Sequence, residues 1–158
     1  MIKRLSIGID PGWNSGAVAL IFEFKDGREV LEVHQFSNMA EVEQADLFYE
    51  LMLMKCPKKA VLEKVWGKRG DTPSTAGKLC ESHGALKMAL MMGKISFSNK
   101  APQTWMKMYG MKKKDGESST QWKTRLWQKA KELYPETKFN KPAGDAVLLA
   151  HYCKHKNW

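Results

Sequence analysis

The sequence predicts a single α/β domain that spans residues 1–158. Two patterns indicate this fold class: short segments in which apolar residues recur with period two, as in strands with one buried face, and longer segments with helical spacing. Their order is a third observation, because a helical segment separates two strand-like ones and favours a parallel crossover. With this length and 43% apolar residues, the chain can bury a substantial core.

The first three strand-like segments follow one another closely. Residues 5–9 alternate, and the breaker pair Pro11 and Gly12 comes soon after them. Residues 16–21 are apolar and predict the returning strand of a hairpin. Residues 29–36 alternate again, so we expect a third strand there.

The middle of the chain supplies the crossover. Residues 40–54 place apolar side chains near helical spacing, and Pro57 ends that helix. Residues 59–65 predict a short apolar strand, which we expect to run parallel to the first. Residues 67–75 are turn-rich and basic and predict a surface loop.

The second half of the chain is mainly helical in pattern. The expected elements are a helix at 75–92, a strand at 95–97, a helix at 101–109, a polar loop at 110–119, a helix at 120–133 and an apolar helix at 145–153. No repeat, low-complexity tract or linker divides the sequence, which supports the prediction of one domain.

The charge balance is strongly basic. Lys and Arg total 26 against 17 Asp and Glu, which gives a net charge of +9 and favours a polyanionic partner, nucleic acid before an anionic membrane surface. No apolar run approaches the roughly 18 residues of a membrane span, and the N-terminus lacks a signal-peptide pattern. The three cysteines have no metal-type spacing and are odd in number, so we expect a reduced intracellular compartment.

Three acidic residues occupy unusual positions. Asp10 ends the first buried strand, Glu63 lies within a later apolar strand, and Asp145 opens the last helix. Asp10 and Asp145 could instead cap a turn and a helix, but a Glu in a buried strand needs a partner or a metal ion. Carboxylates that meet at one point repel each other, and Mg²⁺ or Mn²⁺ would relieve that repulsion. Beside a basic surface, such ions favour phosphodiester hydrolysis.

The segments GIDPGWNSGAVAL, VLEKVW and GDAVLLAHY, in this order and spacing, resemble the RuvC-like Holliday junction resolvases of the RNase H-like superfamily, in a phage or organellar branch. The resemblance implies a mixed five-stranded sheet flanked by helices. It implies that Asp10, Glu63 and Asp145 bind Mg²⁺ or Mn²⁺, and that a homodimer, paired through the 75–92 helix, cuts two strands of like polarity in a four-way DNA junction. The compartment would be the cytoplasm or nucleoid, the host cell for a phage protein, or an organelle.

Further site residues are assigned to DNA. By the same resemblance, Trp66 matches an aromatic position that stacks at the junction centre, and Lys107 matches a basic residue near the scissile phosphate. Trp13 lies beside Asp10, where an aromatic ring can also stack on an unpaired base. Basic loop residues that we expect to contact phosphates, if they are not merely solvated, are Lys68, Arg69, Lys112, Lys113 and Lys114. The remaining helix tryptophans, Trp105 and Trp127 among them, are expected in the core or partly in it.

The sequence departs from the family at one position. The family commonly places a fourth ligand, Asp or His, three to five residues before its last Asp. Asn140 stands five residues before Asp145, where the plastid-type branch has Asp, and an amide is a poorer ligand than a carboxylate. We therefore consider either a variant inactivated by Asp→Asn at 140 or a site completed by other groups. His151 is a poor substitute, because six residues after Asp145 it points to a different helix face.

Three other functions compete with junction resolution. Residues 8–12 resemble the first phosphate loop of actin-like and sugar-kinase ATPases, but that fold needs two such domains and a second phosphate loop. A nuclease of the same fold could act on RNA or replication intermediates instead. A catalytically silent junction binder is the third alternative, which Asn140 supports.

Overall fold

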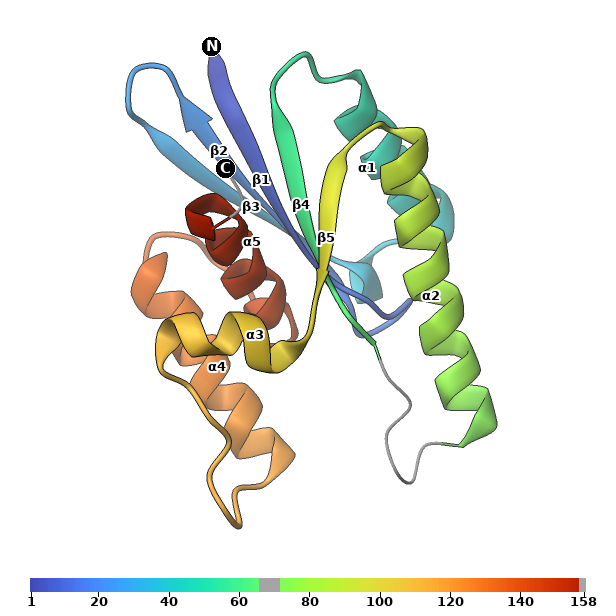
Figure 1. Cartoon of the computed structure of the whole chain (residues 1–158), viewed down its shortest axis with the longest axis vertical. Helices are drawn as coiled ribbons and strands as arrows, with labels where there is room; N and C mark the ends of the chain where they lie inside the picture. Colours follow the sequence, from blue (N-terminus) through green and yellow to red (C-terminus); the bar gives the residue numbers. More distant parts are fainter. Residues whose placement is uncertain (66–71, 157–158) are drawn as a thin grey trace.

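Five strands form one mixed sheet in the order β3-β2-β1-β4-β5 (Figure 1). The computed structural model describes residues 1–65 and 72–156. The strands are β1 (Ile2–Asp10), β2 (Ala17–Phe24), β3 (Glu29–Gln35), β4 (Lys58–Glu63) and β5 (Ser96–Lys100). The first three pair antiparallel, whereas β4 pairs parallel with β1 and β5 pairs parallel with β4. The predicted five-stranded mixed sheet is confirmed, as is the parallel crossover.

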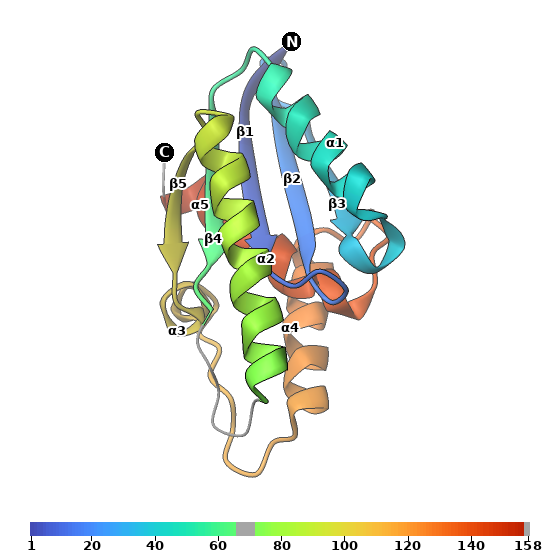
Figure 2. The ribbon, with the colours of Figure 1, turned by 90° about the vertical axis from the view of Figure 1, so that its right-hand side faces the viewer.

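Helices cover both faces of the sheet (Figures 1 and 2). The first face carries α1 (Glu41–Leu53) and α2 (Pro73–Met92), and the second carries α3 (Pro102–Met106), α4 (Ser119–Leu133) and α5 (Gly144–Lys156). Short 3₁₀ helices complete the chain at η1 (Phe36–Asn38), η2 (Lys107–Tyr109) and η3 (Lys141–Ala143).

The alternation of β1 separates two apolar cores. Leu5, Ile7 and Ile9 are fully buried in the core that β1 shares with α1 and α2. On the other face of β1 stands Gly8, and a Cβ added there would lie 2.1 Å from the backbone nitrogen of Ala150 in α5. A glycine is therefore required at position 8, because the α5 backbone rests directly on the strand.

Three elements differ from the sequence prediction. The strand expected at 59–65 is β4, which ends at Glu63 because its pairing with β5 ends there. The strand expected at 95–97 is β5, Ser96–Lys100, because Ile95 is buried in the core with α1 and α2 and pairing with β4 continues to Lys100. The helix expected at 101–109 is divided between α3 and η2, and its last turn brings the Tyr109 hydroxyl within 2.6 Å of the Leu148 carbonyl oxygen, to which it donates.

No helix in the described part of the chain is long and apolar enough to span a bilayer.

Candidate active site

Two of the predicted acids lie side by side at one edge of the sheet. The parallel register of β1 and β4 pairs Ile9 with Leu62, so Asp10 and Glu63 occupy the next position on neighbouring strands, which run about 4.8 Å apart. Both side chains point to the α5 face, because Gly8 and Val61, two residues earlier on each strand, face α5 and its core.

Asp145 reaches the same edge from the first turn of α5. Its side chain keeps only 4% of its accessible area. A carboxylate in the first turn of a helix is stabilised by the unpaired backbone N–H groups and the helix dipole. Asp145 is therefore both buried and electrostatically favoured at the point where α5 meets the ends of β1 and β4.

A cavity of about 480 Å³ opens at this edge. Its lining combines acids from two strands with lysines from three parts of the chain, and includes Asp10, Glu63, Lys64, Lys123 and Lys141. The cavity lining thus brings acidic and basic side chains together at the C-terminal ends of β1 and β4.

Lys123 of α4 is the residue that links the carboxylates, and the sequence analysis did not identify it. Its ammonium group donates to the Asp145 carboxylate in an ion pair. Burial of the ammonium lowers its pKa, but the charges of all three predicted acids, Asp145 first, outweigh that effect and hold the pKa above its ordinary value. Lys123 therefore pairs with Asp145 and lines the same cavity as Asp10 and Glu63.

The sequence does contain a signal for Lys123. It precedes the buried residues Leu126 and Ala130 by three and seven positions, so it shares their helix face. A lysine on the apolar stripe of a helix extends its charged end beyond the core. Here that end reaches the acids.

Trp105 fixes the orientation of Glu63. The indole is completely buried, as expected from the sequence, and its Nε1 donates to Glu63 Oε2 at 2.9 Å. Because the indole belongs to the rigid core beside α5, the hydrogen bond holds one carboxylate oxygen in place. Trp105 is thus a positioning residue, a role that helix periodicity alone did not predict.

The turn after β1 is tied to the opposite helix layer. The backbone N–H of Gly12 donates to the hydroxyl of Ser82 at 3.0 Å, and Ser82 is fully buried in α2. This contact fixes the turn that carries Asp10 and Pro11 into the cavity.

Asn140 and Lys107 lie at the periphery of the site. Asn140 is exposed directly before η3, and the two residues that follow it, Lys141 and Pro142, line the cavity. Lys107 is exposed in η2, and the described residues that line the cavity do not include it. The roles assigned to both residues stay predictions.

The predicted DNA contacts occupy three places. Trp13 is half-buried and lines a groove between α1 and α2, where its carbonyl oxygen accepts from Gln44 Nε2 at 3.4 Å. Trp66, Lys68 and Arg69 lie outside the described residues. The three lysines Lys112, Lys113 and Lys114 are exposed in the loop that leads to α4.

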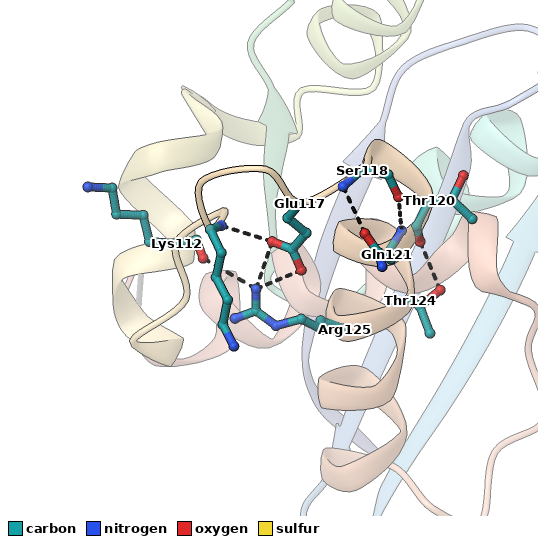
Figure 3. Close-up of polar contacts among 8 residues, drawn as sticks. Lys112, Glu117, Ser118, Thr120, Gln121, Thr124 and Arg125 are labelled. Carbon is teal, nitrogen blue, oxygen red and sulfur yellow. Dashed lines mark hydrogen bonds and ion pairs between the residues drawn. The ribbon is translucent and has the colours of Figure 1, made fainter.

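This basic loop is held by an ion pair (Figure 3). Arg125 Nη1 of α4 donates to both carboxylate oxygens of Glu117 at 2.9 Å. Glu117 in turn accepts from the backbone N–H of Lys114 at 2.9 Å. Ser118 caps α4 by accepting from the backbone N–H of Gln121 at 3.2 Å. The loop therefore presents its lysine side chains from a fixed backbone.

The described ranges, 1–65 and 72–156, contain no group of three Asp, Glu, His or Cys side chains arranged to hold a metal ion in their present positions. His151 is engaged elsewhere, since its Nδ1 lies 3.0 Å from the Tyr134 hydroxyl.

The strand order, the mixed pairing and the helices on both faces of the sheet are those of the RNase H-like α/β fold. Among solved structures, the chain is similar to RuvC of T. thermophilus in complex with a Holliday junction substrate, with a TM-score of 0.62 and 14% identity over 94% of this chain and 91% of that one. A second structure, Thermus thermophilus RuvC, gives a TM-score of 0.55 and 13% identity over 94% and 92% of the two chains. No protein-family model and no curated protein matches the chain.

At these identities the similarity establishes the fold. The chain has the RuvC-like fold that its sequence motifs implied.

Proposed function

We propose that this chain is a metal-dependent endonuclease that resolves four-way DNA junctions. One observation carries the proposal: within a RuvC-like fold, the carboxylates that end β1 and β4 line an open cavity together with Lys123, whose ammonium group pairs with the α5 carboxylate Asp145. The order of these acids along the chain is that of the motifs which resemble the resolvases.

The donor set fits a hard divalent cation. Mg²⁺ and Mn²⁺ prefer carboxylate oxygens, and the ion pair between Lys123 and Asp145 supports a site that attracts positive charge. Asp10, Glu63 and Asp145 would hold the metal. When bound, such ions activate the attacking water and stabilise the departing oxygen of a phosphodiester.

The surrounding residues orient this chemistry. Trp105 holds one oxygen of Glu63, so the carboxylate is preorganised before DNA arrives. Lys123 and Lys141 line the cavity and offer positive charge to a phosphodiester there. Lys123 is better placed for this role than Lys107, because Lys123 lines the cavity and the described lining residues do not include Lys107.

The basic surface supports binding to DNA. The chain has a net charge of +9, and the exposed lysines of the loop before α4 suit phosphate contacts that position a duplex without reading its sequence. The similar RuvC structure was solved with a Holliday junction substrate, which favours branched DNA as the partner. Stacking by Trp13 or Trp66 and phosphate contacts by Lys68 and Arg69 belong to this proposal as further predictions.

A homodimer through α2 is part of the proposal. Gly77, Gly84, Met88 and Met91 fall on one face of α2 at spacings of seven, four and three residues. All four are exposed, and added Cβ atoms at the two glycines would meet nothing within 4 Å. This face can therefore receive a second helix closely, and two-fold symmetry would present two active sites to a two-fold junction.

The test is cleavage of an end-labelled four-way junction with Mg²⁺ or Mn²⁺, with duplex DNA and RNA as comparison substrates. We expect paired nicks in two strands of like polarity, lost in Asp10→Asn. Cleavage of RNA or duplex in preference to the junction would instead indicate another nuclease of this fold.

A silent junction binder is the second candidate, and Asn140 favours it. This binder would retain the junction in a gel-shift assay but produce no nicks. In that case Asn140→Asp restores cleavage if the inactivation hypothesis is correct, and unchanged activity rejects that hypothesis.

A further inference from the structure

We propose that Lys123 occupies the cation position of the carboxylate site in the metal-free protein, so that a divalent ion binds only when Lys123 releases Asp145. This inference rests on the proposed function, because it concerns the same three acids. It assigns to Lys123 a control over metal binding.

The first argument is position. Lys123 lines the cavity, whereas the residues described as lining it do not include Asp145. The Asp145 side chain keeps 4% of its area and the Lys123 side chain keeps 48%. The ammonium group therefore stands between the buried carboxylate and the open cavity, on the path by which an ion would reach Asp145.

The second argument is charge. Asp10, Glu63 and Asp145 would repel one another if no cation lay among them. Lys123 supplies that cation, since it pairs with Asp145 and lines the same cavity as Asp10 and Glu63. A divalent ion supplies twice the charge and takes oxygen ligands directly. An ammonium group and a metal ion in contact with the same carboxylate repel each other, so one displaces the other.

The third argument is the reach of the lysine. Its backbone is fixed in α4, whose buried residues Leu126 and Ala130 pack in the core with α5. Only the side chain has to move, and its exposure leaves an open route from Asp145 into the cavity. The exchange therefore needs rotamer changes rather than a rearrangement of helices.

Isothermal titration of Mn²⁺ into DNA-free protein tests the competition. Lys123→Met keeps the length of the side chain and removes its charge. We expect this variant to bind Mn²⁺ about tenfold more tightly than the wild type, because the hydrogen bond between charged groups no longer has to break. Lys141→Met is the matched control, since it removes the same charge from the same cavity and Lys141 makes no ion pair within the described residues.

A second measurement uses the wild-type protein and does not depend on folding of the variant. Acetylation of lysines by an amine-reactive ester is followed by mass spectrometry, with and without Mn²⁺. We expect the reactivity of Lys123 to rise when the ion binds. The reactivity of Lys129, which forms an ion pair with Glu132 on the same helix, should stay constant.

The outcomes separate the two proposals. If the wild type binds Mn²⁺ and Lys123→Met binds it no more tightly, or if Lys141→Met gains as much, the competition is wrong and the metal site stands. A fall in Lys123 reactivity with Mn²⁺ also overturns the competition. If neither wild type nor variant binds Mn²⁺, the competition and the metal-dependent nuclease are both overturned.

Discussion

Replacing Trp105 by Phe tests whether the indole positions Glu63. The substitution keeps an aromatic ring in a fully buried position and removes the N–H that donates to Glu63 Oε2 at 2.9 Å. A hydrogen bond to a charged group contributes about 1.5–3 kcal/mol. The smaller ring adds a packing loss of about 1 kcal/mol. We therefore expect the free energy of unfolding to fall by about 3 kcal/mol, with a melting temperature lower by roughly 6–12 °C for a chain of this size.

A double-mutant cycle isolates the hydrogen bond from the packing loss. Urea unfolding of the wild type, Trp105→Phe, Glu63→Ala and the double variant should give a coupling energy of about 1.5 kcal/mol or more between the two positions. Trp127→Phe is the control: its Nε1 donates to the Phe139 carbonyl oxygen at 3.2 Å, and it should show no coupling to Glu63→Ala. A coupling energy below about 0.5 kcal/mol for Trp105 would refute the positioning role.

Three further predictions follow from the same structure. Gly8→Ala should lower the free energy of unfolding by about 3 kcal/mol or more, because its Cβ would meet the α5 backbone. Gly77→Ala, whose added Cβ meets nothing within the chain, should raise the free energy of unfolding of the monomer by about 0.5–1 kcal/mol, and chemical denaturation at low protein concentration measures both changes. Replacing Lys112, Lys113 and Lys114 together by Ala should weaken binding to junctions of any sequence. It should also reduce the slope of the logarithm of the association constant against the logarithm of salt concentration by up to about 3, and an unchanged slope in a binding titration would rule out phosphate contacts there. Burial, with the charges of His155 and Lys154, lowers the pKa of His151 from 6.5 to about 4. As pH falls from about 6.5 towards 4, the unfolded chain therefore takes up a proton at His151 that the folded chain does not, and the free energy of unfolding decreases; in His151→Gln it should depend less on pH in that window, which denaturation at several pH values measures.

Much of the fold was predictable because its signals are local. The alternation of Leu5, Ile7 and Ile9 identifies the central strand, and the helix before β4 identifies the parallel crossover. The bounds of β5 were predicted less accurately, because Ser96–Lys100 has one large apolar residue and its strand conformation depends on pairing with β4.

The candidate site was predictable where a residue's place in its own element decides its position. Asp10 was expected at the end of a strand, and parallel strands bring such ends together. Glu63 was expected within a strand at 59–65, and its place at the strand end was not predicted, because β4 ends at Glu63. The contacts of Lys123 and Trp105 depend instead on how α4 and α3 meet α5 and β4, across 22 and 42 residues of sequence. Periodicity predicts which side chains face inward but not which partners they meet there.

The central claim is that the acids of β1, β4 and α5 form one metal site. A crystal of the protein soaked in Mn²⁺ and measured at the manganese absorption edge tests it most directly. We predict an anomalous peak in the cavity with Asp10, Glu63 and Asp145 all within coordination distance and Lys123 withdrawn from Asp145. A peak elsewhere, or one that leaves any of the three carboxylates out of reach, would contradict the account.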